Sequence, residues 1–131
     1  MPIKIINLIR RFVYYFYGEK FFKRFNYNWS HYPSRFEIIQ KIIDKKKYEN
    51  YLEIGCDQDS NFSKIKIKNK IGVDPLSGGN LKMKSDDFFI QNKIIFDCIF
   101  VDGLHTYEQV REDILNSIKF LDPSGVIIVH D

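Results

Sequence analysis

The sequence predicts an α/β fold whose strands form a parallel sheet. Runs rich in β-branched and aromatic residues alternate with segments whose apolar residues recur at helical spacing. The strand-like runs are 51–54, 70–73, 94–101 and 126–129. Strands that alternate with helices join through right-handed crossovers, so we expect a parallel sheet with helices on both faces.

The N-terminal part of the chain differs from the rest in charge and in aromatic content. Residues 1–50 carry 11 Lys and Arg against 4 Asp and Glu, and residues 51–131 carry 9 against 13. The first 50 residues also hold 13 of the 21 aromatic residues. We therefore divide the chain into a basic, aromatic, helical segment at 1–33, with Gly18 as a break between helices, and a domain at 34–131.

Three roles are open for the 1–33 segment. In order of expectation, it covers the sheet or its site, lies on an anionic membrane surface, or binds nucleic acid by stacking aromatic rings on bases. The alternation of aromatic and basic residues does not separate these roles. Nucleic acid is the least expected partner.

A helix is predicted from about 35 to 47. Ser34 is its expected N-cap, and Glu37 stands three residues later, as a capping box requires. Ile39 and Ile43 mark one apolar face, and three lysines occupy the C-terminal turn at 45–47.

The elements that follow alternate as the fold class requires. The runs 51–54, 70–73 and 94–101 predict strands, the apolar spacing at 107–121 predicts a helix, and 126–129 predicts a last strand after a turn at 123–125.

Length and composition exclude several classes of protein. A chain of 131 residues with 44% apolar residues is one ordinary globular domain, not a disordered protein. Cys56 and Cys98 are too few for a disulfide framework and are typical of packing residues in a reducing compartment, so we expect a cytoplasmic protein. The charge-free stretch at 12–18 is far shorter than the ~20 residues of a spanning helix, and no secretory signal is evident.

Polar residues follow each predicted strand. They are Gly55 to Ser60, Asp74 and Pro75, Asp102 and Gly103 with His105, and His130 and Asp131. Ligands of open parallel sheets bind beyond the carboxyl ends of the strands, so this pattern predicts a site.

The loop after the first strand indicates which ligand fits. Gly55 lets a ligand approach the backbone, and Asp74 follows 19 residues later, at the spacing of a carboxylate that binds ribose hydroxyls. The loop has no further glycine before Ser60 but contains Asp57 and Asp59, which would repel a pyrophosphate and attract a cation.

Five segments in order carry a resemblance to a known family: Y-L-E-I-G, K-I-G-V-D-P, S-D-D-F-F, F-D-C-I-F-V-D-G-L-H-T-Y-E-Q-V-R-E-D and G-V-I-I-V-H-D. Over residues 48–131 the chain resembles the class I S-adenosylmethionine-dependent methyltransferases, most of all the group that includes sugar and macrolide O-methyltransferases. The resemblance implies a Rossmann-like sheet and transfer of a methyl group from S-adenosylmethionine to a hydroxyl of a small molecule, with a sugar as one acceptor.

The resemblance also implies which residues bind the cofactor. Glu53 and Gly55 match the motif that lines its methionine part, Asp74 matches the acceptor of the ribose hydroxyls, and Ser85 and Asp86 match the segment beside the adenine. The full set of expected cofactor-binding residues is Glu53, Gly55, Asp57, Asp74, Ser85, Asp86 and Asp102.

Asp102 and His105 are the expected catalytic pair, because methyl transfer to a hydroxyl needs a base for the acceptor proton. For His105 the alternative of capping the helix near Tyr107 stays open. Some relatives hold a divalent metal with an Asp after the fourth strand and acidic residues after the fifth. Asp102 and Asp131 are the counterparts here, which makes Mg²⁺ a second expected cofactor.

The chain departs from the family in lacking the usual second glycine of the first loop and in ending at Asp131, where two further strands normally follow. We therefore expect an incomplete sheet, truncated after the fifth strand of the family, whose exposed edge strand invites a second copy of the chain. A non-catalytic, cofactor-binding remnant is the alternative function. A nicotinamide-dependent oxidoreductase is a third hypothesis, which the absent glycine-rich loop opposes.

Overall fold

The computed structural model describes residues 31–130. Residues 1–30, on which the predicted N-terminal helices fall, and Asp131 lie outside the described residues. Backbone contacts divide the chain into Met1–Tyr32 and Pro33–Asp131. The elements of the second unit, in chain order, are α3 (Arg35–Lys46), β1 (Asn50–Ile54), the 3₁₀ turn η3 (Phe62–Lys64), β2 (Asn69–Val73), α4 (Ser85–Gln91), β3 (Phe96–Val101), α5 (Tyr107–Lys119) and β4 (Leu121–Val129).

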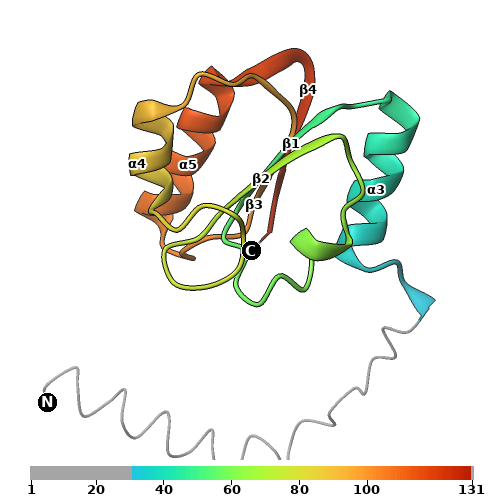
Figure 1. Cartoon of the computed structure of the whole chain (residues 1–131), viewed down its shortest axis with the longest axis horizontal. Coiled ribbons are helices and arrows are strands. Elements are labelled where there is room, and N and C mark those ends of the chain that lie inside the picture. The colour runs from blue at the N-terminus through green and yellow to red at the C-terminus, as the bar shows by residue number, and fades with distance from the viewer. Residues whose placement is uncertain (1–30, 131) are drawn as a thin grey trace, which may run out of the picture. The chain divides into compact units, whose positions relative to one another are not determined.

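The four strands form one parallel sheet in the order β2-β1-β3-β4, which confirms the predicted α/β, Rossmann-like class (Figure 1). The chain leaves β1 toward β2 on one side and returns to β3 on the other. Strand order therefore reverses between β1 and β3, where ligands of such sheets bind. Ile54 pairs with both Val73 and Val101, so the three strands end at the same level.

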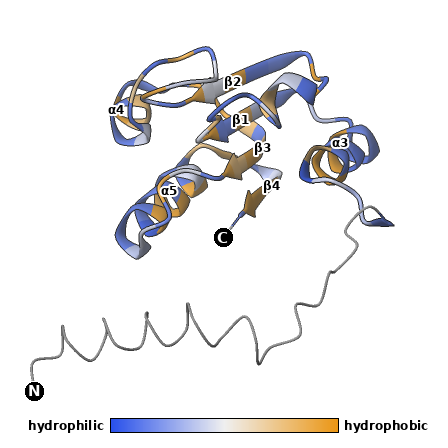
Figure 2. Cartoon of the chain, turned by 90° about the horizontal axis from the view of Figure 1, so that it is seen from below, coloured by the Kyte–Doolittle hydropathy of each residue, from blue (hydrophilic) through white to orange (hydrophobic). Residues whose placement is uncertain are grey.

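Helices cover both faces of the sheet, as predicted. In Figure 1, α4 and α5 lie together on one face and α3 lies on the other. The alternation of side chains along the strands supplies the two cores. Tyr51 and Cys98 pack with Ile39 of α3, whereas Leu52 and Ile99 pack with Phe88 of α4. Figure 2 shows the apolar colouring of β3 between these helical layers.

Helix α3 begins and ends as the sequence predicts. The carboxylate of Glu37 accepts hydrogen bonds from both the backbone N–H and the hydroxyl of Ser34, each at 2.7 Å. These two bonds hold the pKa of Glu37 below its usual value. Lys47 ends the helix in a left-handed conformation, with φ of 58°. Residues Ile39 and Ile43 are buried, which confirms the apolar face of this helix.

Helix α4 was not predicted from the sequence. The resemblance implied only that Ser85 and Asp86 belong to a segment beside the adenine of the cofactor. Its seven residues bury Phe88 and Phe89, and the Phe89 ring stacks on Phe120 at 5.8 Å between centroids. Two turns are too short for apolar periodicity to show.

The last two elements depart from the prediction in detail. Helix α5 ends at Lys119, and its buried residues are Asp113 and Ser117, not the apolar residues whose spacing predicted it. Strand β4 begins at Leu121, and the predicted 123–125 turn falls in its irregular part, where the pairing with β3 shifts register. Within residues 31–130, no helix has the length and hydropathy needed to cross a bilayer.

Gly55 directly follows β1 and packs against the backbone that follows β3. Its φ is +82°, and a Cβ there would lie 2.2 Å from the carbonyl oxygen of Asp102 and 2.6 Å from Cα of Gly103. Both atoms belong to the backbone and cannot rotate away. Only glycine fits at this point of the sheet.

We expect Gly55→Ala to lower the free energy of unfolding by at least about 2 kcal/mol, because it combines backbone strain with a steric clash. Urea denaturation of the full chain measures this change. The control is Gly103→Ala, whose Cβ would meet only Ile54 at 3.4 Å and Asp113 at 3.5 Å. Equal losses in the two variants would contradict the steric argument.

Candidate functional site

A cavity of about 690 Å³ opens at the carboxyl ends of the strands. This volume is typical of a small-molecule site. Its lining brings together every predicted site residue that the structure describes: Glu53, Gly55, Asp57, Asp74, Ser85, Asp86, Asp102 and His105. Asp131, the second predicted metal ligand, lies outside the described residues.

Glu53 forms the buried end of the cavity. The side chain of Glu53 is 1% exposed, and its carboxylate accepts hydrogen bonds from the Tyr51 hydroxyl at 2.6 Å and from Nδ2 of Asn61 at 2.8 Å. Burial raises the pKa of Glu53, and the bonds from Tyr51 and Asn61 act in the opposite direction. No cation pairs with this carboxylate in the described part of the chain.

Asn61 was not predicted as a site residue. It is 5% exposed and lines the cavity, and its Oδ1 atom has no hydrogen-bond partner among residues 31–130. A buried acceptor without a donor is unfavourable by about 1–3 kcal/mol. Together with Glu53 it makes this end of the cavity rich in acceptors and short of donors, so the site favours a ligand with a cationic N–H group.

The loop after β1 has aspartates, and no second glycine, at the positions where its backbone turns left-handed. Asp57 and Asp59 adopt left-handed conformations, with φ of 46° and 60°. After glycine, Asp and Asn are the residues that tolerate this region best. Asp59 also accepts a hydrogen bond from the N–H of Gly79 at 2.6 Å, which ties the loop to the turn that follows β2. The absent second glycine is therefore compatible with a tight turn.

Asp74 joins the two loops that border the cavity. Its carboxylate accepts backbone N–H bonds at 2.8 to 3.1 Å from Cys56, Asp57, Leu76 and Ser77. Burial by itself raises the pKa of Asp74, but these four bonds outweigh it and leave the pKa below its ordinary value. An ionised carboxylate has about four acceptor positions, and the backbone fills all of them. Ribose binding by Asp74 stays a prediction, and loop closure is a role that the sequence did not indicate.

Asp102 is the centre of a second cluster at the cavity. Its Oδ2 atom lies 2.5 Å from Nη1 of Arg35, and its Oδ1 atom lies 3.1 Å from Nδ1 of His130 and 3.6 Å from Nε2 of His105. One ligand atom from each of Asp102, His105 and His130 falls within 4.8 Å of the others, the geometry of a candidate metal site. Arg35 was missed because it precedes the sheet and follows no strand.

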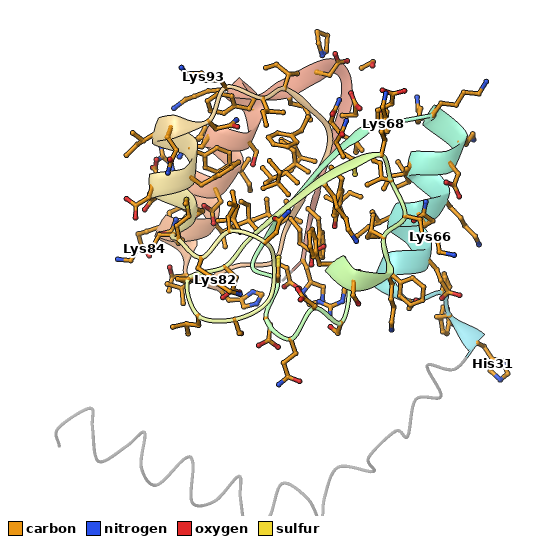
Figure 3. All side chains as sticks on the ribbon, in the orientation of Figure 1. His31, Lys66, Lys68, Lys82, Lys84 and Lys93 are labelled. Carbon is orange, nitrogen blue, oxygen red and sulfur yellow. The ribbon has the colours of Figure 1, made fainter. Side chains whose placement is uncertain are left out.

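The remaining wall of the cavity comes from the start of α4. The side-chain oxygens of Ser85 and Asp86 both accept from Nε2 of Gln109, at 3.3 and 3.2 Å. Lys84 also lines the cavity and lies at the N-terminal end of α4, next to Ser85, whereas Lys93 lies beyond its other end (Figure 3). The wall is thus polar and anchored to α5.

We expect Asp74→Asn to lower the free energy of unfolding at pH 7 by about 2–3 kcal/mol, because an amide nitrogen would face two N–H donors. The difference from the parent should shrink below about pH 4, since a lowered pKa stabilises the fold only while the carboxyl group is ionised. Denaturation series at several pH values measure it. Asp57→Asn is the control, because Asn tolerates the same backbone conformation. A pH-independent difference would contradict the charge argument.

Comparison with known proteins agrees with this geometry. Residues 26–131 match the model of a methyltransferase domain. An uncharacterised protein of Dictyostelium discoideum is 28% identical over 116 residues, covering 88% of this chain and 16% of its own length. An uncharacterised protein of Acanthamoeba polyphaga mimivirus is 28% identical over 128 residues, covering 73% of this chain and 58% of its own length.

The chain thus spans 16% and 58% of these two relatives. The match to the domain model, by contrast, covers the whole sheet and the cavity. The chain belongs to a methyltransferase domain family.

Proposed function

We propose that the domain transfers a methyl group from S-adenosylmethionine to a hydroxyl of a small molecule, with sugars as one acceptor class. The observation that supports this most is the distribution of charge in the cavity. Carboxylates line it from the Glu53 end to α4, and a base candidate, His105, stands beside Asp102. A cationic cofactor fits the first part, and a hydroxyl acceptor fits the second.

The residues present fit the cofactor. Glu53 and the unpartnered Oδ1 atom of Asn61 suit its ammonium group. The backbone of Gly55 lines the same cavity. Asp57 adds negative charge near this end, and Ser85 and Asp86 offer acceptors to the exocyclic amine of the adenine. When bound, the cofactor supplies an electrophilic methyl group on a sulfonium.

The residues near Asp102 then position the acceptor and remove its proton. His105 is half exposed and lines the cavity, so its imidazole is open to an acceptor hydroxyl. Asp102 faces this imidazole and balances the positive charge that it gains on taking the proton. Arg35 holds the other carboxylate oxygen of Asp102 and fixes its orientation. Most of the rate enhancement would come from holding the reactants in line.

The Asp102 cluster also supports a metal-binding role. Asp102, His105 and His130 present one carboxylate oxygen and two imidazole nitrogens, a donor set that suits Zn²⁺ or Mn²⁺ better than Mg²⁺. This ligand set differs from the pair Asp102 and Asp131 that the sequence suggested. A histidine that ligates a metal cannot use the same nitrogen as a base. The metal-binding role and the base role of His105 therefore exclude each other at that nitrogen, and metal titration can distinguish them.

Calorimetric titration of the full chain with S-adenosylmethionine and, as control, NAD tests the cofactor. We expect binding of the first alone. Asp86→Asn should weaken it about tenfold, because one charged hydrogen bond is worth roughly 1.5–3 kcal/mol. Its neighbour Asp87, exposed and outside the cavity lining, provides the control Asp87→Asn. Binding of NAD alone would instead support an oxidoreductase, and binding of neither would contradict a cofactor site.

Titration with Zn²⁺, Mn²⁺ and Mg²⁺ tests the metal. If the cluster binds a metal, Zn²⁺ should bind most tightly, and His130→Gln should weaken it at least tenfold. His31→Gln is the control, because His31 is not part of the cluster. Failure of all three ions to bind would remove the metal from the proposal and leave His105 as the base.

A further inference from the structure

Helix α5 buries a carboxyl group that the proposed chemistry does not use. Asp113 is 1% exposed, on the helix face where an apolar residue would ordinarily pack. No ion pair of the described residues includes it. Burying an unpaired carboxylate is strongly unfavourable unless hydrogen bonds stabilise it, so its presence needs a physical reason.

The contacts of Asp113 connect it to the wall of the cavity that the start of α4 forms. Its Oδ1 atom accepts from Nε2 of Gln109 at 3.2 Å, and the Ser85 hydroxyl also hydrogen-bonds the carboxylate. The same Gln109 nitrogen contacts Ser85 and Asp86. Four side chains from two helices thus form one network, the α4–α5 cluster: Ser85, Asp86, Gln109 and Asp113. All four line the cavity.

The side-chain amide of Gln109 can bond this cluster because only the backbone N–H of Gln109 takes part in capping the helix. Its N–H donates to Oγ1 of the N-cap residue Thr106 at 3.4 Å, and its side chain does not return to the cap as in a capping box. Gln109 and Asp113 stand one turn apart on the same face of α5. The amide is therefore held between Asp113 on one side and α4 on the other.

The cluster has more acceptors than donors. Two carboxylates and a hydroxyl oxygen share the two hydrogens of one amide nitrogen and the single hydrogen of Ser85. Burial raises the pKa of Asp113, the bonds from Ser85 and Gln109 lower it, and the neighbouring charges of Asp86 and Glu112 raise it further. A ligand that brings N–H donors relieves this shortage, and a ligand that brings an acceptor increases it.

We propose that Asp113 is a positioning residue for the nucleobase end of the site, which holds Gln109 and Ser85 so that the cluster accepts a base with an exocyclic amino group. The inference rests on the proposed function and adds a basis for selectivity. Adenine carries an amino donor where hypoxanthine carries a carbonyl acceptor. A site with acceptors at that point discriminates against the carbonyl, because two acceptors then face each other.

The test compares S-adenosylhomocysteine and S-inosylhomocysteine by calorimetry on the full chain. These two ligands differ at C6, amino against carbonyl, and at the adjacent N1, which carries a hydrogen only in the inosyl compound. The parent should prefer the adenosyl compound at least tenfold. Asp113→Asn keeps the shape of the side chain but introduces an amide donor toward Gln109, so the preference should fall to about threefold or less, mainly through weaker binding of the adenosyl compound.

The control is Glu112→Gln, which removes a neighbouring exposed carboxylate of the same helix and should leave the preference unchanged. If Asp113→Asn does not fold, Asp113→Ser, which shortens the side chain and removes the carboxylate that holds Gln109, should lower the preference in the same way. An equal loss of affinity for both ligands, or an unchanged preference, would overturn the positioning role. Binding of neither ligand to the parent would overturn the proposed function itself.

Discussion

The close approach of β1 and β3 at their carboxyl ends is the constraint on which the site depends. Because the chain turns to opposite sides after these two neighbouring strands, nothing but backbone separates Gly55 from Asp102. The absence of a side chain at Gly55 allows these two backbone segments to lie in contact. This contact between the strand ends also places Asp102 in the lining of the cavity, together with Glu53. A single glycine thus sets both the packing of the sheet and the position of the site.

Around this point the fold buries or nearly buries three carboxylates, and burial raises the pKa of two of them, Glu53 and Asp113. Glu53 and Asp113 are each 1% exposed, and Asp74 is 8% exposed. None of the three has a cationic partner in the described residues, and each is stabilised by hydrogen bonds from N–H or hydroxyl groups. Hydrogen bonds keep these acceptors in fixed directions. For Glu53 and Asp113, whose pKa burial raises, this comes at some loss of stability, which is typical of functional sites. The cavity is therefore shaped for a ligand that brings positive charge and donors.

Several elements were predictable because their signals are local. The capping box of Ser34 and Glu37 marks the start of α3, and the run before Asp102 marks β3. Helix α4 was missed because seven residues show no periodicity. Helix α5 was found, but its buried face was not, because apolar spacing indicated a different set of residues from Asp113 and Ser117. The apolar pattern predicts that a helix forms, and the packing decides which side faces the sheet.

The strands, the glycine and the acidic residues that follow the strands could be predicted from the amino-acid sequence alone. Parallel topology forces strand ends to one edge, so residues at those positions meet whatever the details of packing. The side chains that complete the site depend on how the chain packs in three dimensions. Arg35 reaches Asp102 from 67 residues away, Asn61 reaches Glu53 from the position before a 3₁₀ turn, and Gln109 links two helices. These partners follow no strand and show no periodicity, because their positions depend on how helices and loops pack against the sheet.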